Sequence, residues 1–228
     1  SKDGDTSVTI PGTVTTIGQD AFAGNTRITS VTIPNSVTSI GANAFQGDTA
    51  LTTVKMGSGV QIIGGSAFSG DIALTSMSLP SSLLSIGANA LNNTALETVE
   101  IPVGVTSIGA GTFSDMQNLE AIKVASGNNA YSSSDGALYN SAGTKLIFVP
   151  RAKSSITIKA GTTVIGSNAM DGNENLTAIT IPDSVTSIEE NALSGTGIKS
   201  ISIPKTVTSI AEQSNWDVEE IKGYAGST

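Results

Sequence analysis

A unit of 23 residues with the form L-x-x-V-x-I-P-x-x-V-T-x-I-G-x-x-A-F recurs along nearly all of this 228-residue chain, and residues 28–45 fill every slot of it. The last apolar residue of each predicted strand recurs at steps of 23, 23, 23, 22, 23, 34, 23 and 22 residues: Ile10, Ile33, Met56, Leu79, Ile101, Val124, Ile158, Ile181 and Ile203. One such unit cannot bury its apolar side, so the units must stack into a solenoid.

Proline, glycine and phenylalanine occupy fixed places in the unit. Six of the seven prolines directly follow the strand residue, where proline ends the strand because it fixes φ and lacks an N–H group. A glycine recurs eight residues after the strand, which predicts a corner where a side chain would clash or φ must be positive. Four of the five phenylalanines lie twelve residues after the strand, and we expect them to face the core: Phe22, Phe45, Phe68 and Phe113.

This run resembles the BspA-like class of leucine-rich repeats of bacterial surface proteins, from Val8 to about Ile221. The resemblance implies a right-handed, curved leucine-rich-repeat solenoid of α/β type, rich in β-structure, with about eight repeats. It implies one parallel strand per repeat on the concave face, and short helical or irregular turns around A-F on the convex face. It also implies adhesion to host proteins or to other cells, and hence a location at the cell surface or outside the cell.

We expect one solenoid domain over residues 1–228. The 34-residue step contains a segment at about 125–155 that lacks the repeat pattern, and two short apolar runs around a Gly-containing turn predict a β-hairpin there. After Ile203 the pattern decays, so residues 211–228 are expected to form a degenerate terminal unit. Trp216 is expected to cover the end of the core and, with the acidic Asp217, Glu219 and Glu220, to begin a terminal cap with a polar outer side.

The composition excludes several kinds of chemistry. The chain has no Cys and no His, which excludes the usual zinc sites, Cys or His nucleophiles and histidine pH sensing, and we expect no metal site and no cofactor. The net charge of −8 argues against nucleic-acid binding. No stretch approaches the ~18 consecutive apolar residues of a membrane span, so no membrane insertion is expected. Because the chain starts at Ser1 in a polar run without a signal peptide, we interpret it as part of a longer protein.

Acidic residues recur about once per repeat, mainly in predicted loops: Asp20, Asp48, Asp71, Asp115 and Asp171. Stacking would align some of them along one edge, and we interpret such a column as a solvated rim rather than a site. Neither a catalytic pair of carboxylates nor an activated serine is indicated. We therefore expect no catalytic residues and no enzyme.

The irregular segment is a first candidate surface. From Lys123 to Lys159 there are five basic residues and one acid, Asp135, which gives a charge of +4. This segment forms a contact patch in one interpretation, since aromatic residues and Arg are enriched where partners dock. In the other, which we favour for the aromatic residues, these side chains fill the core of the hairpin and the lysines protect strand edges. The candidate residues are Lys123, Tyr131, Tyr139, Lys145, Arg151, Lys153 and Lys159.

The outer face of the strands is the second candidate surface. The residue between V and I points away from the core because side chains alternate along a strand. This slot is rich in Ser and Thr, and its charged members are Lys55, Glu100 and Lys123. We expect a weak, extended contact with surface or matrix proteins of a host or a neighbouring cell. A structural spacer that projects another domain and, with less support, a carbohydrate-binding module remain alternatives, and incompletely capped ends favour weak end-to-end self-association.

Overall fold

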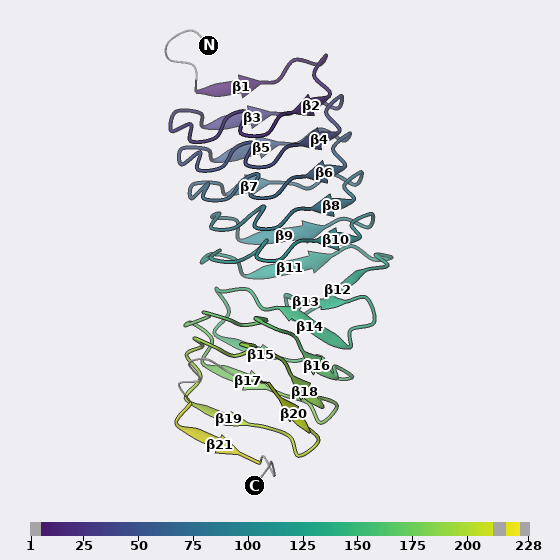
Figure 1. The fold of residues 1–228 in the computed structure, drawn as a ribbon, viewed down its shortest axis with the longest axis vertical. Coiled ribbons are helices and arrows are strands. Elements are labelled where there is room, and N and C mark those ends of the chain that lie inside the picture. Colours follow the sequence, from purple (N-terminus) through teal and green to yellow (C-terminus); the bar gives the residue numbers. More distant parts are fainter. Residues whose placement is uncertain (1–5, 212–217, 224–228) are drawn as a thin grey trace. The chain divides into compact units, whose positions relative to one another are not determined.

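The computed structural model describes residues 6–211 and 218–223, and these residues form strands and turns of a parallel β-solenoid of about nine turns (Figure 1). The chain packs into two compact units, unit 1 with Ser1–Asn118 and Ala125–Asn129, and unit 2 with Leu119–Val124 and Ala130–Thr228. The described part of the chain contains no helix, and therefore none that could cross a membrane. A single domain over residues 1–228 and a right-handed solenoid both stay predictions.

Unit 1 contains two rows of strands. The L-x-x-V-x-I segments form the first strand row: β1 (Ser7–Thr9), β3 (Ser30–Thr32), β5 (Thr53–Lys55), β7 (Ser76–Met77) and β9 (Thr98–Ile101). The V-T-x-I segments form the second strand row, in which each strand pairs in parallel with the next: β2 (Thr16–Ile17), β4 (Ser39–Ile40), β6 (Ile62–Ile63), β8 (Ser85–Ile86) and β10 (Ser107–Ile108). Equivalent residues align, such as Val8 with Val31 and Ile17 with Ile40, so the sequence repeat sets the register.

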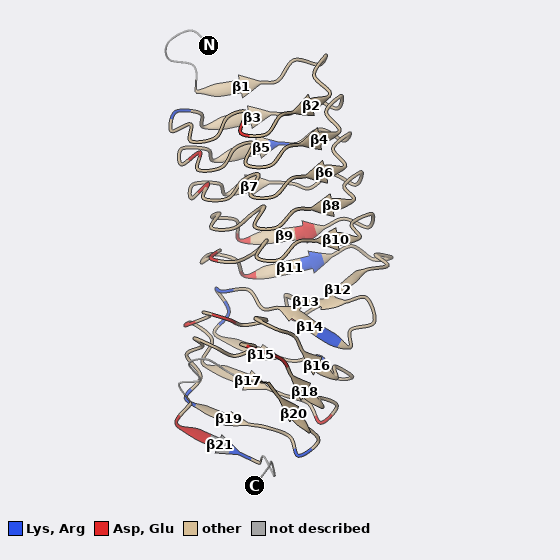
Figure 2. Cartoon of the chain, in the orientation of Figure 1, with Lys and Arg blue, Asp and Glu red and all other residues tan. Residues whose placement is uncertain are grey.

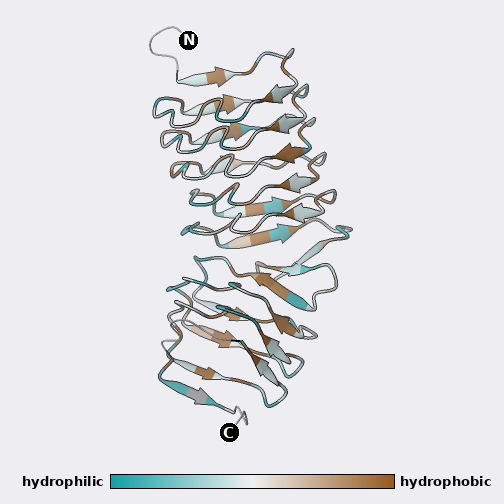
Figure 3. Ribbon diagram, in the orientation of Figure 1, coloured by the Kyte–Doolittle hydropathy of each residue, from teal (hydrophilic) through white to brown (hydrophobic). Residues whose placement is uncertain are grey.

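The core of unit 1 lies between the two rows, and apolar residues recur along both rows (Figure 3). Phe45 and Phe68 are fully buried, and the rings of Phe22, Phe45 and Phe68 stack at centroid distances of 5.0 and 5.2 Å. Most corner glycines of unit 1 are required by close backbone approach, since a Cβ on Gly87 would lie 2.4 Å from the backbone of the preceding coil, but a Cβ on Gly18 would meet nothing within 4 Å. The predicted core phenylalanines are confirmed, although Phe22 is only half-buried, and the glycine corners are confirmed except at Gly18.

The turns that follow these glycines are irregular, and the prediction of α/β type with helical turns is wrong for the described residues. In one turn Asn43 and Gly47 both adopt left-handed φ values, 56° and 74°, which a right-handed helix does not allow. The turn residues instead hydrogen-bond from coil to coil, as where Phe45 N–H donates to Ala67 O at 2.8 Å. These bonds, which include Phe22 to Ala44 and Phe68 to Ala90, form a turn ladder beside the two strand rows.

Unit 2 begins with β11 (Ala121–Val124) and the irregular segment. The predicted hairpin is confirmed within a three-stranded antiparallel meander: β12 (Tyr131–Ser134), β13 (Ala137–Asn140) and β14 (Lys145–Phe148). Strand β14 then pairs in parallel with β16, with Leu146 opposite Ile165. The segment therefore replaces the second-row strand of its repeat, and its core joins that of the following coils.

The rest of unit 2 returns to the repeat. Its first-row strands are β15 (Ser155–Thr157), β17 (Ala178–Thr180), β19 (Ser200–Ser202) and β21 (Glu220–Lys222). Its second-row strands after β14 are β16 (Val164–Ile165), β18 (Ser187–Ile188) and β20 (Ser209–Ile210). Of the residues expected to begin the terminal cap, Glu219 and Glu220 are exposed, whereas Trp216 and Asp217 lie outside the described residues.

Candidate binding surfaces

The outward slot of the first strand row in unit 1 forms a column across the coils. Thr9, Thr32 and Lys55 are opposite one another in the paired strands. Lys55 and Glu100 are exposed, and among the described residues neither side chain forms an ion pair. Figure 2 shows how few strands carry charge, with β5 and β9 among them. These two side chains are therefore available to a partner of unit 1.

Many threonines beside this column are engaged within the solenoid. Thr29 Oγ1 donates to Thr6 O at 3.2 Å, and Thr52 Oγ1 donates to Thr29 O at 3.0 Å. The same contact recurs in the second strand row between Thr38 and Thr15. These hydroxyl groups tie each coil to the coil before it, so the abundance of Thr is explained by packing without a ligand.

In unit 2 the slot residue Lys123 is exposed and, among the described residues, also forms no ion pair. Lys159 is likewise exposed, at the edge of the meander. These are the members of the predicted basic patch whose charge is directed to solvent.

Three other basic residues of the predicted patch are engaged inside unit 2. Lys145 Nζ lies 2.8 Å from both carboxylate oxygens of Glu189, and this bond is the main cause that lowers the pKa of Glu189. Lys153 pairs with Asp135 at 3.0 Å, and Arg151 donates to a backbone carbonyl of a neighbouring turn. The charge of +4 was counted over residues 123–159, and Glu189 lies outside that segment. Because Glu189 pairs with Lys145 in the structure, the positive charge of the segment is partly neutralised.

The aromatic residues of the meander are mostly inside it. Tyr139 is fully buried, and its hydroxyl accepts a hydrogen bond from Lys159 N–H at 3.2 Å. Burial raises the pKa of Tyr139. Tyr131 and Phe148 are half-buried. Tyr139 therefore has no surface for a partner and is removed from the candidate contact residues, in agreement with the interpretation that aromatic residues fill this core.

The acidic column is not a solvated rim at two of its positions, because Asp48 and Asp71 are fully buried. Asp48 Oδ1 accepts the N–H of Asn25 at 2.7 Å, and Asp71 Oδ1 accepts the N–H of Asp48 at 2.9 Å. Their Oδ2 atoms are buried without a hydrogen-bond partner among the described residues. Burial raises the pKa of Asp48 to about 6 and, with the nearby Asp48 charge adding, that of Asp71 to about 8.

These buried acids have a structural role that the sequence pattern only partly indicated. Asn25, Asp48 and Asp71 are spaced by 23 residues, and Asn173 occupies the equivalent position in unit 2. Asn173 is buried as well, and its side chain donates to Pro150 O at 3.0 Å. A protonated Asp resembles Asn in shape and neutrality, so an amide fits the position that Asp71 occupies. No three acids in the described residues gather into a possible metal site.

Comparison with protein families finds the model of the "BspA type leucine rich repeat region" in six copies, which match residues 4–120, 40–153 and 147–222. A search of curated proteins found no match. Among solved structures, a leucine-rich repeat protein of Eubacterium ventriosum is 32% identical, with a TM-score of 0.76 over 90% of this chain and 56% of its own. The present chain therefore spans little more than half the length of that relative.

Two more distant structures share the fold. The pneumococcal vaccine antigen PcpA is 22% identical, with a TM-score of 0.66 over 94% of this chain and 71% of its own. A leucine-rich cell surface protein of Faecalibacterium prausnitzii is 24% identical, with a TM-score of 0.52 over 98% of this chain and 88% of its own. At this level of identity the likeness concerns the fold alone.

Proposed function

Because the chain belongs to the family of BspA type leucine rich repeat proteins, we propose that it is a non-enzymatic protein-binding module of a bacterial cell surface. One relative of the same fold is described as a cell surface protein and another as a vaccine antigen, which supports this location. Its partners would be surface or matrix proteins of a host or a neighbouring cell.

The observation that carries the proposal is the contrast between two sets of charges. Lys55, Glu100 and Lys123 extend from first-row or equivalent strands to solvent without an ion pair in the described part of the chain, whereas Lys145 and Lys153 are paired inside unit 2. Unpaired charges on a strand face steer and orient a protein partner, while paired ones mainly stabilise their own unit. The outward charges on the first-row strands of each unit are thus better candidate contact sites than the irregular segment.

The test measures binding of the immobilised, folded chain to a panel of host matrix proteins and glycans at two salt concentrations. We expect saturable binding to at least one protein, weakened by salt and reduced about three- to tenfold by Lys55→Glu or Lys123→Glu. Lys205→Glu, an exposed charge in a turn of unit 2, is the matched control and should leave binding unchanged. If Lys205→Glu reduces binding as much as Lys55→Glu does, the outward charges of the first-row strands are rejected as the contact site.

A structural spacer is the second candidate, favoured by the hydroxyl groups of Thr29, Thr38 and Thr52, which bond to the preceding coil. A folded chain that binds no member of the panel would support the spacer. Binding to glycans alone, without salt dependence, would favour the carbohydrate-binding alternative.

A further inference from the structure

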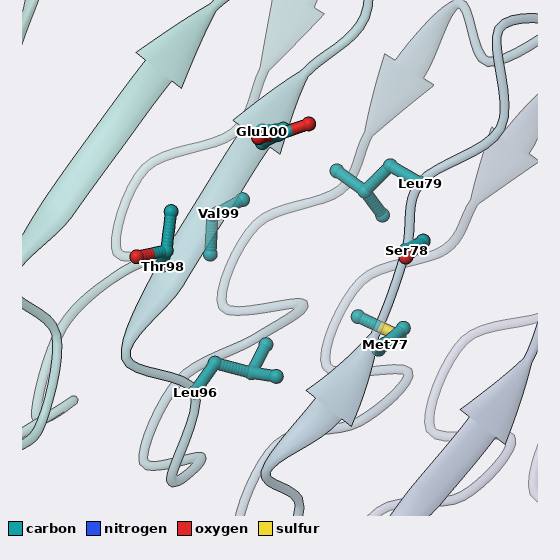
Figure 4. A pocket seen from close by; sticks show the side chains of 7 residues that line it. All are labelled: Met77, Ser78, Leu79, Leu96, Thr98, Val99 and Glu100. Atoms are coloured by element: carbon teal, nitrogen blue, oxygen red, sulfur yellow. The ribbon is translucent and has the colours of Figure 1, made fainter.

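The first strand row of unit 1 is interrupted between β7 and β9. Strands β1, β3, β5 and β7 pair in order, but β9 does not pair with β7. In these two fully described strands no Cα atom of one lies within 8 Å of a Cα atom of the other. Paired strands are about 4.8 Å apart. The interruption is therefore a real opening in the row, and we name it the β7–β9 slot (Figure 4).

The rest of the coil closes normally around the slot. In the second strand row β8 pairs with both β6 and β10. The turn ladder also continues, with Ser66 N–H donating to Ala88 O at 2.8 Å and Asn89 N–H to Ala110 O at 3.0 Å. Two continuous ladders thus hold the flanking coils together while the first row stays open.

A one-residue deletion coincides with the slot. The step from Leu79 to Ile101 is 22 residues, and the loop before β9 reads Thr94-Ala95-Leu96 where the preceding repeat reads Asp-Ile-Ala-Leu. The other 22-residue step, from Ile181 to Ile203, ends at β19, and there too β17 and β19 do not pair. Those two strands still approach within 8 Å. A short loop therefore coincides with lost pairing twice, but opens a slot only once.

Backbone groups on the slot edges lack the partners that other steps supply. Thr52 N–H donates to Thr29 O at 2.9 Å, and Thr75 N–H donates to Thr52 O at 3.1 Å. The corresponding bond from Glu97 to Thr75 is absent from the described residues. Unpaired strand edges are templates for an added strand. Two edges that face each other present such a template from both sides.

The slot also has apolar side chains at its base, although most of its exposed lining is polar. Its cavity has a volume of about 290 Å³, and Figure 4 shows the side chains of Leu79, Leu96 and Val99 in the space between the strands, beside Met77. At the outer rim Glu100 is exposed, and Ser78 on the opposite side is neutral. An occupant would thus meet polar backbone edges and some apolar side chains inside the slot, and one negative charge outside it.

We propose that the β7–β9 slot binds an extended segment of a partner polypeptide, which adds one strand between β7 and β9. A strand seated between two others needs them about 9.6 Å apart, which agrees with a separation beyond 8 Å. The segment would carry an apolar side chain toward Leu96 and a Lys or Arg on its outer face, beside Glu100. This inference rests on the proposed protein-binding function and names the class of partner segment.

A synthetic, fluorescently labelled peptide with the sequence of residues 49–58 is a suitable probe, because in the register of the row it directs Val inward and Lys outward. Binding to the folded chain is followed by fluorescence anisotropy. We expect saturable binding that is lost when the amide of the peptide Val is N-methylated. Glu100→Lys should weaken binding about fivefold and should restore the affinity of a peptide in which Lys is replaced by Glu.

The deletion supplies a second variant. Insertion of one residue between Ala95 and Leu96 restores the 23-residue repeat and should close the slot, with loss of peptide binding. The same insertion between Gly197 and Ile198, in the other short repeat, is the matched control and should leave peptide binding unchanged. Circular dichroism establishes that each variant is folded, and the N-methylated peptide tests the unmodified chain should an insertion variant not fold.

The results also separate this inference from the proposed function. Peptide binding without binding to any panel protein would support the slot and reject adhesion to that panel. Three results would overturn the slot as the partner site. The N-methylated and unmodified peptides could bind equally, or no saturable binding could be seen up to millimolar peptide. The third is binding to a panel protein that the Ala95–Leu96 insertion leaves unchanged.

Discussion

Substitution of Asp71 by Asn tests whether this buried carboxyl group is neutral in the folded chain. Asp71 is fully buried, its Oδ1 accepts the N–H of Asp48, and its Oδ2 has no partner in the described residues. Burial raises its pKa to about 8 from the ordinary 3.8, so the folded chain holds this proton at pH 7 and the unfolded chain does not. Asn25 and Asn173 stand at the equivalent position in other repeats, so an amide fits there.

The magnitude follows from the two pKa values. A raised pKa in the folded state means that this group destabilises the fold progressively as pH rises, from about 3.8 to about 8. At pH 7 the loss amounts to about 4 kcal/mol relative to acidic pH. Asp71→Asn removes this pH dependence but introduces a second amide hydrogen that needs a partner. We therefore expect the free energy of unfolding to rise by about 2–4 kcal/mol at pH 7.

Urea unfolding followed by circular dichroism at several pH values between 3 and 8.5 measures this difference. The stability of Asp71→Asn relative to the unmodified chain should increase steadily with pH over this range. Asp20→Asn is the control, because Asp20 is exposed in an equivalent turn, and it should change the stability by less than about 0.5 kcal/mol at every pH. A difference for Asp71→Asn that stays constant between pH 5 and 8 would refute a buried, protonated carboxyl group.

Two further substitutions test the packing, with Gly12→Ala as a control, and a third tests an ion pair. Phe45→Ala should cost about 3–5 kcal/mol in urea unfolding, because its buried ring stacks on both neighbouring coils. Gly87→Ala should cost about 1–3 kcal/mol, since its Cβ would meet backbone at 2.4 Å, whereas Gly12→Ala should be tolerated with nothing within 4 Å. Lys145→Met should cost at most about 1 kcal/mol at pH 7, because its side chain and that of Glu189 are 42% and 33% exposed. That cost should disappear in thermal melts as pH falls through the lowered pKa of Glu189 and its carboxylate becomes protonated.

The repeat pattern predicted the parallel first-row strands, the proline turns, the glycine corners and the buried phenylalanines, because each depends on position within one unit. It did not predict the second strand row, since each V-T-x-I strand is only two residues long and gains stability from its neighbours in the stack. The helical turns were wrong for a related reason. In these turns, residues with left-handed φ values such as Asn43 and Gly47 stand beside residues that hydrogen-bond to the next coil. Both features depend on the stacking of the coils.

Charge was the least predictable property. Lys145 and Glu189 are 44 residues apart in sequence, so a count over the irregular segment could not include their ion pair. Asp48 and Asp71 were recognised as periodic, but acidic residues are mostly exposed, and only the coil geometry buries these two. In a solenoid, the environment of a loop residue is set by the next coil as much as by its own.

The same principle explains how a repetitive chain can acquire a local site. A change of one side chain alters one position in the repeat, whereas a deletion in one loop shifts a whole strand relative to the coil before it. Strand β9 lost its pairing with β7 while the second strand row and the turn ladder stayed continuous, so the consequence of the deletion is confined to one side of one coil. Two facing backbone edges, the apolar side chains between them and Glu100 then meet between β7 and β9, although each residue there is ordinary for its position in the repeat. In this protein a short repeat therefore marks where first-row pairing is lost, and at one of its two occurrences the flanking strands also separate to form the candidate site.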